Sequence, residues 1–92
     1  MNSQIYCNVE DIYAAMRKIS AALTQHEQLD AARELNETIN NYWTTSSEAL
    51  GETRLILLSV RPVVEKYLEA AMLRLLDEAA RAANDLWHGK PA

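Results

Sequence analysis

Apolar residues recur at intervals of three and four along almost the whole of this 92-residue chain. In the N-terminal part the intervals are carried by Val9, Ile12, Met16, Ile19 and Leu23. This period places apolar side chains on one face of an α-helix, and no segment alternates in the way that β-strands do. Ala, Leu, Glu and Arg are common, while Gly and Pro number two each, a composition that favours helices. The sequence therefore predicts an all-α fold.

The expected architecture is a small antiparallel helical bundle of three to four helices, because a chain of this length fits one domain. We expect an N-terminal arm over residues 1–8, a single bundle domain over 9–88 and a C-terminal tail over 89–92. Asn8 is a good N-cap for a first helix over 9–23, since Glu10 and Asp11 follow in its first turn.

Thr24 followed by Glu27 matches a capping box and predicts the start of a second helix. One unbroken helix is the alternative, because neither Gly nor Pro interrupts this stretch. Asn36 falls within the apolar stripe of this helix, where it could fix register, although a partly exposed position at the stripe's edge is favoured. Thr45 with Glu48 is a second capping box and predicts a third helix over about 47–60.

Pro62 lacks a backbone N–H and is expected to break the chain, or sharply kink it, between helices three and four. The fourth helix would then be long, running from Pro62 to Trp87, with Gly89 and Pro91 ending it. The run Leu55–Leu58 is apolar all round its helix turn, so we expect it to be covered on every side.

The predicted length of helix four suggests a homodimer. Residues 62–87 would span about 39 Å, against about 21–26 Å for helices of 14–17 residues, so the last helix would overhang its neighbours. The candidate interface on this overhang consists of Ala79, Ala83, Leu86 and Trp87. A two-fold mate would cover such an apolar patch. The alternative is that the N-terminal arm, with Ile5 and Tyr6, folds back over it.

No reaction centre is visible in the sequence. His26 and His88 lie far apart, and Cys7 has no cysteine partner and is expected to be a free thiol without a catalytic role. We expect no metal and no cofactor. The net charge of −4 disfavours nucleic-acid binding. No apolar run is long enough for a signal peptide or a membrane span, so a cytoplasmic location without membrane contact is predicted.

Two short patterns resemble known families. Arg81 and His88 are separated by six residues, which resembles the Arg-x4–6-His motif of HEPN ribonucleases and implies RNA cleavage by these two residues, although Ala82 stands where that family usually has a polar residue. The position of Trp43 resembles the Trp-x-Gly turn of the helical-hairpin substrates of type VII secretion, but Thr45 replaces the Gly and Pro62 would interrupt their second helix.

The residues themselves offer apolar helix faces and acidic outer faces without catalytic groups. They favour a non-enzymatic, homo-oligomeric module for protein–protein interaction, in an antitoxin-, immunity- or adaptor-like role with an unidentified protein partner. The alternatives are a HEPN-like ribonuclease that uses Arg81 and His88, and a hairpin of the type VII secretion kind.

Overall fold

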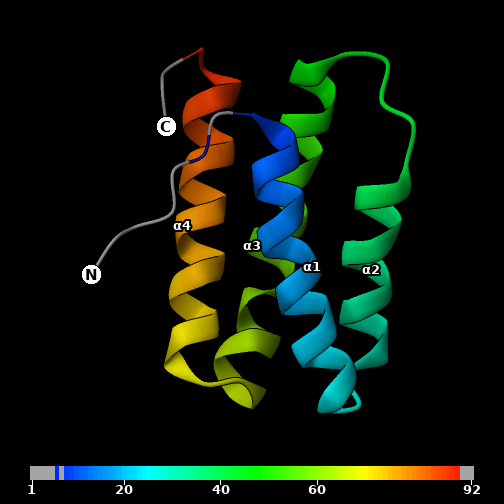
Figure 1. The fold of residues 1–92 in the computed structure, drawn as a ribbon, viewed down its shortest axis with the longest axis vertical. Helices are drawn as coiled ribbons and strands as arrows, with labels where there is room; N and C mark the ends of the chain where they lie inside the picture. Colours follow the sequence, from blue (N-terminus) through cyan, green and yellow to red (C-terminus); the bar gives the residue numbers. More distant parts are fainter. Residues whose placement is uncertain (1–5, 7, 90–92) are drawn as a thin grey trace.

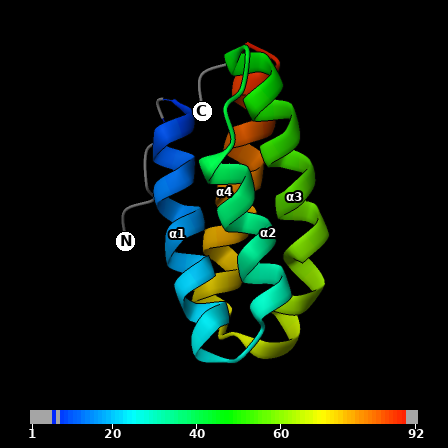
Figure 2. The same cartoon turned by 90° about the vertical axis from the view of Figure 1, so that its right-hand side faces the viewer.

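Four helices make up the fold in the computed structural model, which describes residue 6 and residues 8–89. They are α1 (Val9–Gln25), α2 (Leu29–Asn40), α3 (Ser46–Tyr67) and α4 (Ala70–Trp87). Successive helices run in opposite directions (Figure 1). After a quarter turn, α1 and α3 lie on opposite sides of the bundle, with α2 in front and α4 behind (Figure 2). The predicted all-α antiparallel bundle is confirmed, with four helices.

Two of the predicted N-caps are present as hydrogen bonds. Asn8 Oδ1 accepts from the backbone N–H of Asp11 at 3.2 Å, at the start of α1. Thr45 Oγ1 accepts from the N–H of Glu48 at 3.1 Å, at the start of α3. The Glu48 carboxylate accepts from the N–H of Thr44 at 3.3 Å, one residue before the partner that a capping box would use. Both helix starts were predictable from the sequence, because a capping side chain bonds to a backbone group only a few residues away.

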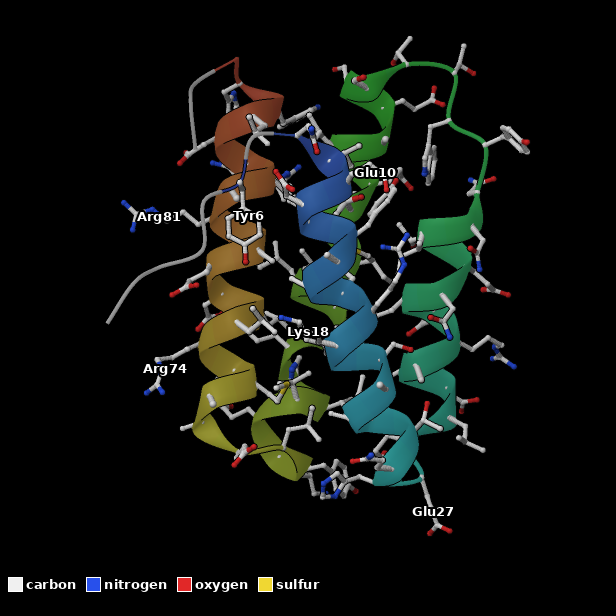
Figure 3. All side chains as sticks on the ribbon, in the orientation of Figure 1. Tyr6, Glu10, Lys18, Glu27, Arg74 and Arg81 are labelled. Carbon is white, nitrogen blue, oxygen red and sulfur yellow. The ribbon has the colours of Figure 1, made fainter. Side chains whose placement is uncertain are left out.

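The break between the first two helices is confirmed, but the prediction that helix two starts at Thr24 is wrong. Thr24 lies inside α1 and its hydroxyl donates to the Ser20 carbonyl at 2.9 Å. The chain reverses at Glu27, whose φ of 60° is left-handed. The N–H of Glu27 donates to the Thr24 carbonyl and that of Gln28 to the Leu23 carbonyl. This is the Schellman pattern that ends many helices, here with glutamate in the usual glycine position. Figure 3 shows the Glu27 side chain pointing away from the bundle.

The predicted break at Pro62 is wrong, because α3 continues through this residue to Tyr67. A proline in a helix removes the donor for the carbonyl four residues earlier, here that of Leu58. Pro62 is exposed, so this carbonyl lies on the water-facing side of α3, where solvent can replace the lost bond. The proline is therefore tolerated inside the helix.

The chain turns between α3 and α4 at Leu68 and Glu69, both of which are extended. Neither is a Gly or Pro, and no side chain of residue 6 or residues 8–89 caps the start of α4. The Glu69 carbonyl accepts from the backbone N–H groups of Met72 and Leu73 and so begins the helix. Helix four consequently starts at Ala70 instead of Pro62 and has 18 residues, while α3 has 22.

The core is formed by one face of each helix, together with Tyr6. Its largest fully buried side chains are Ile12, Met16, Ile19, Leu23, Leu35, Leu57, Leu76, Val60, Val64 and Thr53. Alanines on α4 face the core as well and let this helix approach its neighbours closely. The buried Ser20 hydroxyl donates to Asn36 Oδ1 at 3.0 Å and thereby ties α1 to α2. Asn36 is exposed at the edge of its stripe, as favoured from the sequence.

Candidate interaction surface

Groups that could carry chemistry are dispersed over the bundle. Within residue 6 and residues 8–89, no three His, Cys, Asp or Glu side chains come together in a way that could hold a metal ion. His26 follows α1 and His88 follows α4, so the two lie at opposite ends of the bundle (Figure 1). Cys7 falls outside the described residues, so its predicted free thiol stays a prediction.

Among the described residues, two side chains have pKa values moved from their ordinary range, and each shift has a structural explanation. The pKa of Arg61 is raised because its guanidinium donates to the Asp77 carboxylate and lies beside its charge. The two bonds, at 2.8 and 3.2 Å, join α3 to α4 on the surface. The pKa of the Tyr6 phenol is raised, mainly by burial and further by the charges of Glu78 and Asp11. A surface ion pair thus accounts for the raised pKa of Arg61, and burial mainly accounts for that of Tyr6.

Arg81 and His88, the pair behind the ribonuclease resemblance, are not assembled into a site. They are two helical turns apart, about 10 Å along the axis. Arg81 is exposed and projects outward from α4 (Figure 3). The His88 ring packs against the Trp87 ring, with centroids 5.0 Å apart. In the part of the chain that the structure describes, no hydrogen bond or ion pair links Arg81 or the His88 imidazole to another side chain.

The hollows on the surface of the described residues are open to solvent. One, of about 450 Å³, lies at the end of the bundle and is lined by His26, Tyr67, Glu69 and Met72 together with α1 residues. Small-molecule sites usually enclose most of their ligand. These open hollows therefore do not point to a small-molecule site.

Of the four candidate interface residues, two belong to the interior of the chain. Ala79 and Ala83 are fully buried, Leu86 is partly buried and Trp87 is 38% exposed. The predicted overhang is wrong, because α4 spans about 27 Å and the neighbouring α3 about 33 Å. Because a break was expected at Pro62, the predicted helix four was too long and the predicted helix three was too short.

The alternative, in which the N-terminal arm covers α4, is supported at Tyr6. Its side chain is 5% exposed and belongs to the core. Figure 3 shows the ring between α1 and α4. Ile5, the other residue of that expectation, lies outside the described residues. Part of the apolar surface of α4 is thus covered by the chain itself.

An apolar stripe lies instead on the outer side of α3. Leu55 is 50% exposed, Leu58 is 51% exposed and Pro62 is also exposed. Spacings of three and four place the three residues on one face of the helix. In Figure 2, α3 forms one edge of the bundle and no helix lies beyond it. The expectation that the Leu55–Leu58 turn is covered on every side is therefore wrong, although Leu57 is fully buried.

Trp87 extends this stripe from α4. A Cβ atom at Gly51 would lie 3.1 Å from the indole nitrogen of Trp87, so the ring rests on α3 where glycine leaves room. Gly51 is one turn before Leu55. The Arg54 guanidinium lies 4.6 Å from the Trp87 ring centroid, and its buried Nε has no hydrogen-bond partner among the described residues. We refer to Leu55, Leu58, Pro62 and Trp87 as the outer stripe.

Trp43, which carried the second resemblance, lies in the connection between α2 and α3. Its indole N–H donates to the carbonyl of Thr38 at 3.2 Å, so the ring closes the end of α2. The two-helix hairpin that this resemblance implies is contradicted, because the chain folds as four helices.

Compared with known proteins, the chain matches no family model, no curated protein and no solved structure. Among the described residues, no helix combines the length and the apolar character needed to cross a membrane. The outer stripe is therefore the feature of this molecule that points to a function. Trp87 was predicted from the sequence as an interface residue, whereas Arg54 and the exposure of Leu55 and Leu58 were not predicted. The available signal was the spacing from Gly51 to Leu55 to Leu58, which forms a second stripe on the side of the helix opposite the buried one.

Proposed function

We propose that this chain is a non-enzymatic protein–protein interaction module, working in the cytoplasm, that forms a homodimer through the outer stripe. The supporting observation is that half-exposed leucines on α3 adjoin a part-exposed tryptophan on α4. Single exposed apolar residues are ordinary on soluble proteins, whereas contiguous ones mark interaction sites. An antitoxin-, immunity- or adaptor-like role, in which the dimer binds a different protein, belongs to the same proposal.

The energetics favour such a contact. A chain of about 90 residues buries only about 60–65% of the surface that it exposes when unfolded, so association adds stability to a thin margin. Complete burial of a leucine contributes about 1.5–3 kcal/mol, and Leu55 and Leu58 each have half of their surface left to bury. Trp and Arg are the residues most enriched at the energetic centres of interfaces, and the stripe places Trp87 beside Arg54.

The test is the mass of the particle in solution, measured by light scattering at tens of micromolar. The wild-type chain is expected to have the mass of a dimer. Leu58→Glu places a charge at the centre of the stripe and is expected to give a monomer with unchanged helix content. Leu29→Glu is the matched control, because Leu29 is 61% exposed but lies at the start of α2, outside the stripe.

A wild-type mass of one chain would refute the proposal. So would a Leu58→Glu variant that remains as dimeric as the Leu29→Glu control. Circular dichroism on each variant separates loss of the dimer from loss of the fold.

A further inference from the structure

The charged residues beside the outer stripe indicate how a second copy of the chain would be oriented. This step rests on the proposed homodimer. We propose that the second copy docks with its α3 antiparallel to α3 of the first, around a two-fold axis that passes close to Ser59. The contact would join the outer stripes of the two chains and pair Glu52 of each copy with Lys66 of the other.

The apolar residues fit this arrangement. In a two-fold contact, if residue i meets residue j of the mate, then j also meets i. Leu55 and Pro62 lie at equal distances on either side of the Leu58–Ser59 peptide. An antiparallel register centred there places Leu55 against Pro62 of the mate twice, with the two copies of Leu58 near the axis. All three side chains are exposed in the single chain and free to make this contact.

The rim of the stripe supplies the second observation. Glu52, Ser59 and Lys66 follow one another at intervals of seven, and all three are exposed. Residues seven apart stay within about 20° of each other around a helix, so the three line one edge of the stripe. The acid and the base lie about 10 Å on either side of Ser59 along the axis. Reversal of the helix direction about Ser59 therefore brings opposite charges together at both ends.

These two charges are available for such a pairing. Within residue 6 and residues 8–89, neither Glu52 nor Lys66 has an ion-pair partner. The Lys66 ammonium lies 5.3 Å from the centroid of the neighbouring Tyr67 ring, a contact that leaves its charge uncompensated. Because each chain carries a net charge of −4, two copies repel each other, and local pairing of opposite charges is needed where they meet.

The opposite rim of the outer stripe, which carries Arg54 and Glu65, explains why an antiparallel arrangement is favoured over a parallel one. Parallel helices related by a two-fold axis would bring the Glu52 rim against the opposite rim of the mate. The charges on that rim already have partners in their own chain. Arg54 is stacked on Trp87. Glu65 is paired with Arg61 at 3.7 Å. Antiparallel docking leaves these contacts intact and uses only unpaired groups.

The experiment is a charge swap read out as the dimer dissociation constant, measured by sedimentation equilibrium. Glu52→Lys alone and Lys66→Glu alone are each expected to weaken the dimer by about tenfold, since each turns two attractive pairs into repulsive ones. The double variant restores both pairs with reversed sign and is expected to return to within about twofold of wild type. Lys18→Glu is the control, because it changes the net charge as Lys66→Glu does but lies on α1, across the bundle from α3 (Figures 2 and 3).

The outcomes separate the two proposals. A wild-type chain that is monomeric refutes the homodimer, and the antiparallel register with it. A wild-type dimer whose double variant stays as weak as the single variants, or weaker, refutes the antiparallel register and leaves the homodimer standing. A Lys18→Glu variant that weakens the dimer as much as Lys66→Glu also refutes the register, because net charge alone would then explain the effect.

Discussion

The inner and outer faces of α3 contain the same kind of residue in very different surroundings. Leu57 is fully buried against the other helices, whereas its neighbour Leu58 is 51% exposed. A rotation of about 100° around the helix separates them. Their chemistry is identical, so the positions of α1, α2 and α4 alone decide which leucine stabilises the fold and which is left for a partner. An apolar helix turn is therefore no proof that every side of it is covered.

The largest effect is expected on stability, when Leu57 and Leu58 are each replaced by alanine and compared. Leu57→Ala should lower the free energy of unfolding by about 2–5 kcal/mol, because it leaves a cavity in the core. Leu58→Ala should lower it by less than about 1 kcal/mol when measured at concentrations low enough to exclude association. Urea denaturation followed by circular dichroism measures both. Equal effects for the two variants would show that the faces of α3 are wrongly assigned.

The second effect concerns the tryptophan of the outer stripe. Trp87→Glu should weaken the dimer by at least about tenfold, since a charge in an apolar contact costs more than 1.4 kcal/mol. Tyr42→Glu is the control, because this aromatic residue is 98% exposed and lies in the connection between α2 and α3. Sedimentation at several concentrations measures both variants. If Trp87→Glu dimerises as well as the control, the contact does not include α4.

Features that depend on hydrogen bonds between near neighbours were predictable from the sequence. The caps at Asn8 and Thr45 are confirmed, because a side-chain oxygen has to reach only two or three residues along the chain. Gly89, with a φ of 77°, ends α4 as expected, because glycine readily adopts the left-handed conformation. The α1–α2 turn was displaced from Thr24 to Glu27, a residue whose left-handed conformation has no sequence signal.

Features that depend on distant parts of the chain were not predictable. The turn at Leu68 and Glu69 contains no helix breaker, so its position depends on the packing of α4 against α3 and α1. Pro62 failed as a breaker because it faces solvent. In the same way, the burial of Ala79 and the exposure of Leu58 depend on which helices lie opposite each residue. The homodimer stays a proposal that depends on the outer stripe, because α4 is shorter than α3 and does not overhang it.

The third effect is a pH dependence of stability that is expected for the buried Tyr6, and the exposed Tyr42 serves as the comparison. Burial, with Glu78 and Asp11 nearby, raises the pKa of Tyr6 in the folded chain above the ordinary value of 10.0. The neutral phenol is therefore favoured in the folded state. The stability that the neutral phenol contributes is complete below pH 10. It is lost as the pH rises through the raised pKa of Tyr6 in the folded state. Unfolding free energies measured across this range should fall more steeply for wild type than for Tyr6→Phe.

At neutral pH, Tyr6→Phe should leave stability unchanged or raise it by up to about 1 kcal/mol, because the buried hydroxyl has no hydrogen-bond partner in the part of the chain that the structure describes. Tyr42→Phe removes an exposed phenol and serves as the control. A loss of stability in Tyr6→Phe at neutral pH that exceeds the loss in the control would indicate that the Tyr6 hydroxyl is hydrogen-bonded after all.

The smallest effect is expected for RNA cleavage. This test compares the outer face of α4, which carries Arg81, with the outer face of α3, which is proposed to bind a second copy. General acid–base catalysis needs groups within hydrogen-bond reach of the same reacting atoms. Arg81 points into solvent and His88 packs against Trp87, two turns further along α4. We expect no cleavage when wild-type protein is incubated with single-stranded RNA, and the same stability for Arg81→Ala as for wild type. Cleavage by wild type that is abolished in both Arg81→Ala and His88→Ala, with helix content intact, would replace the interaction module with an enzyme.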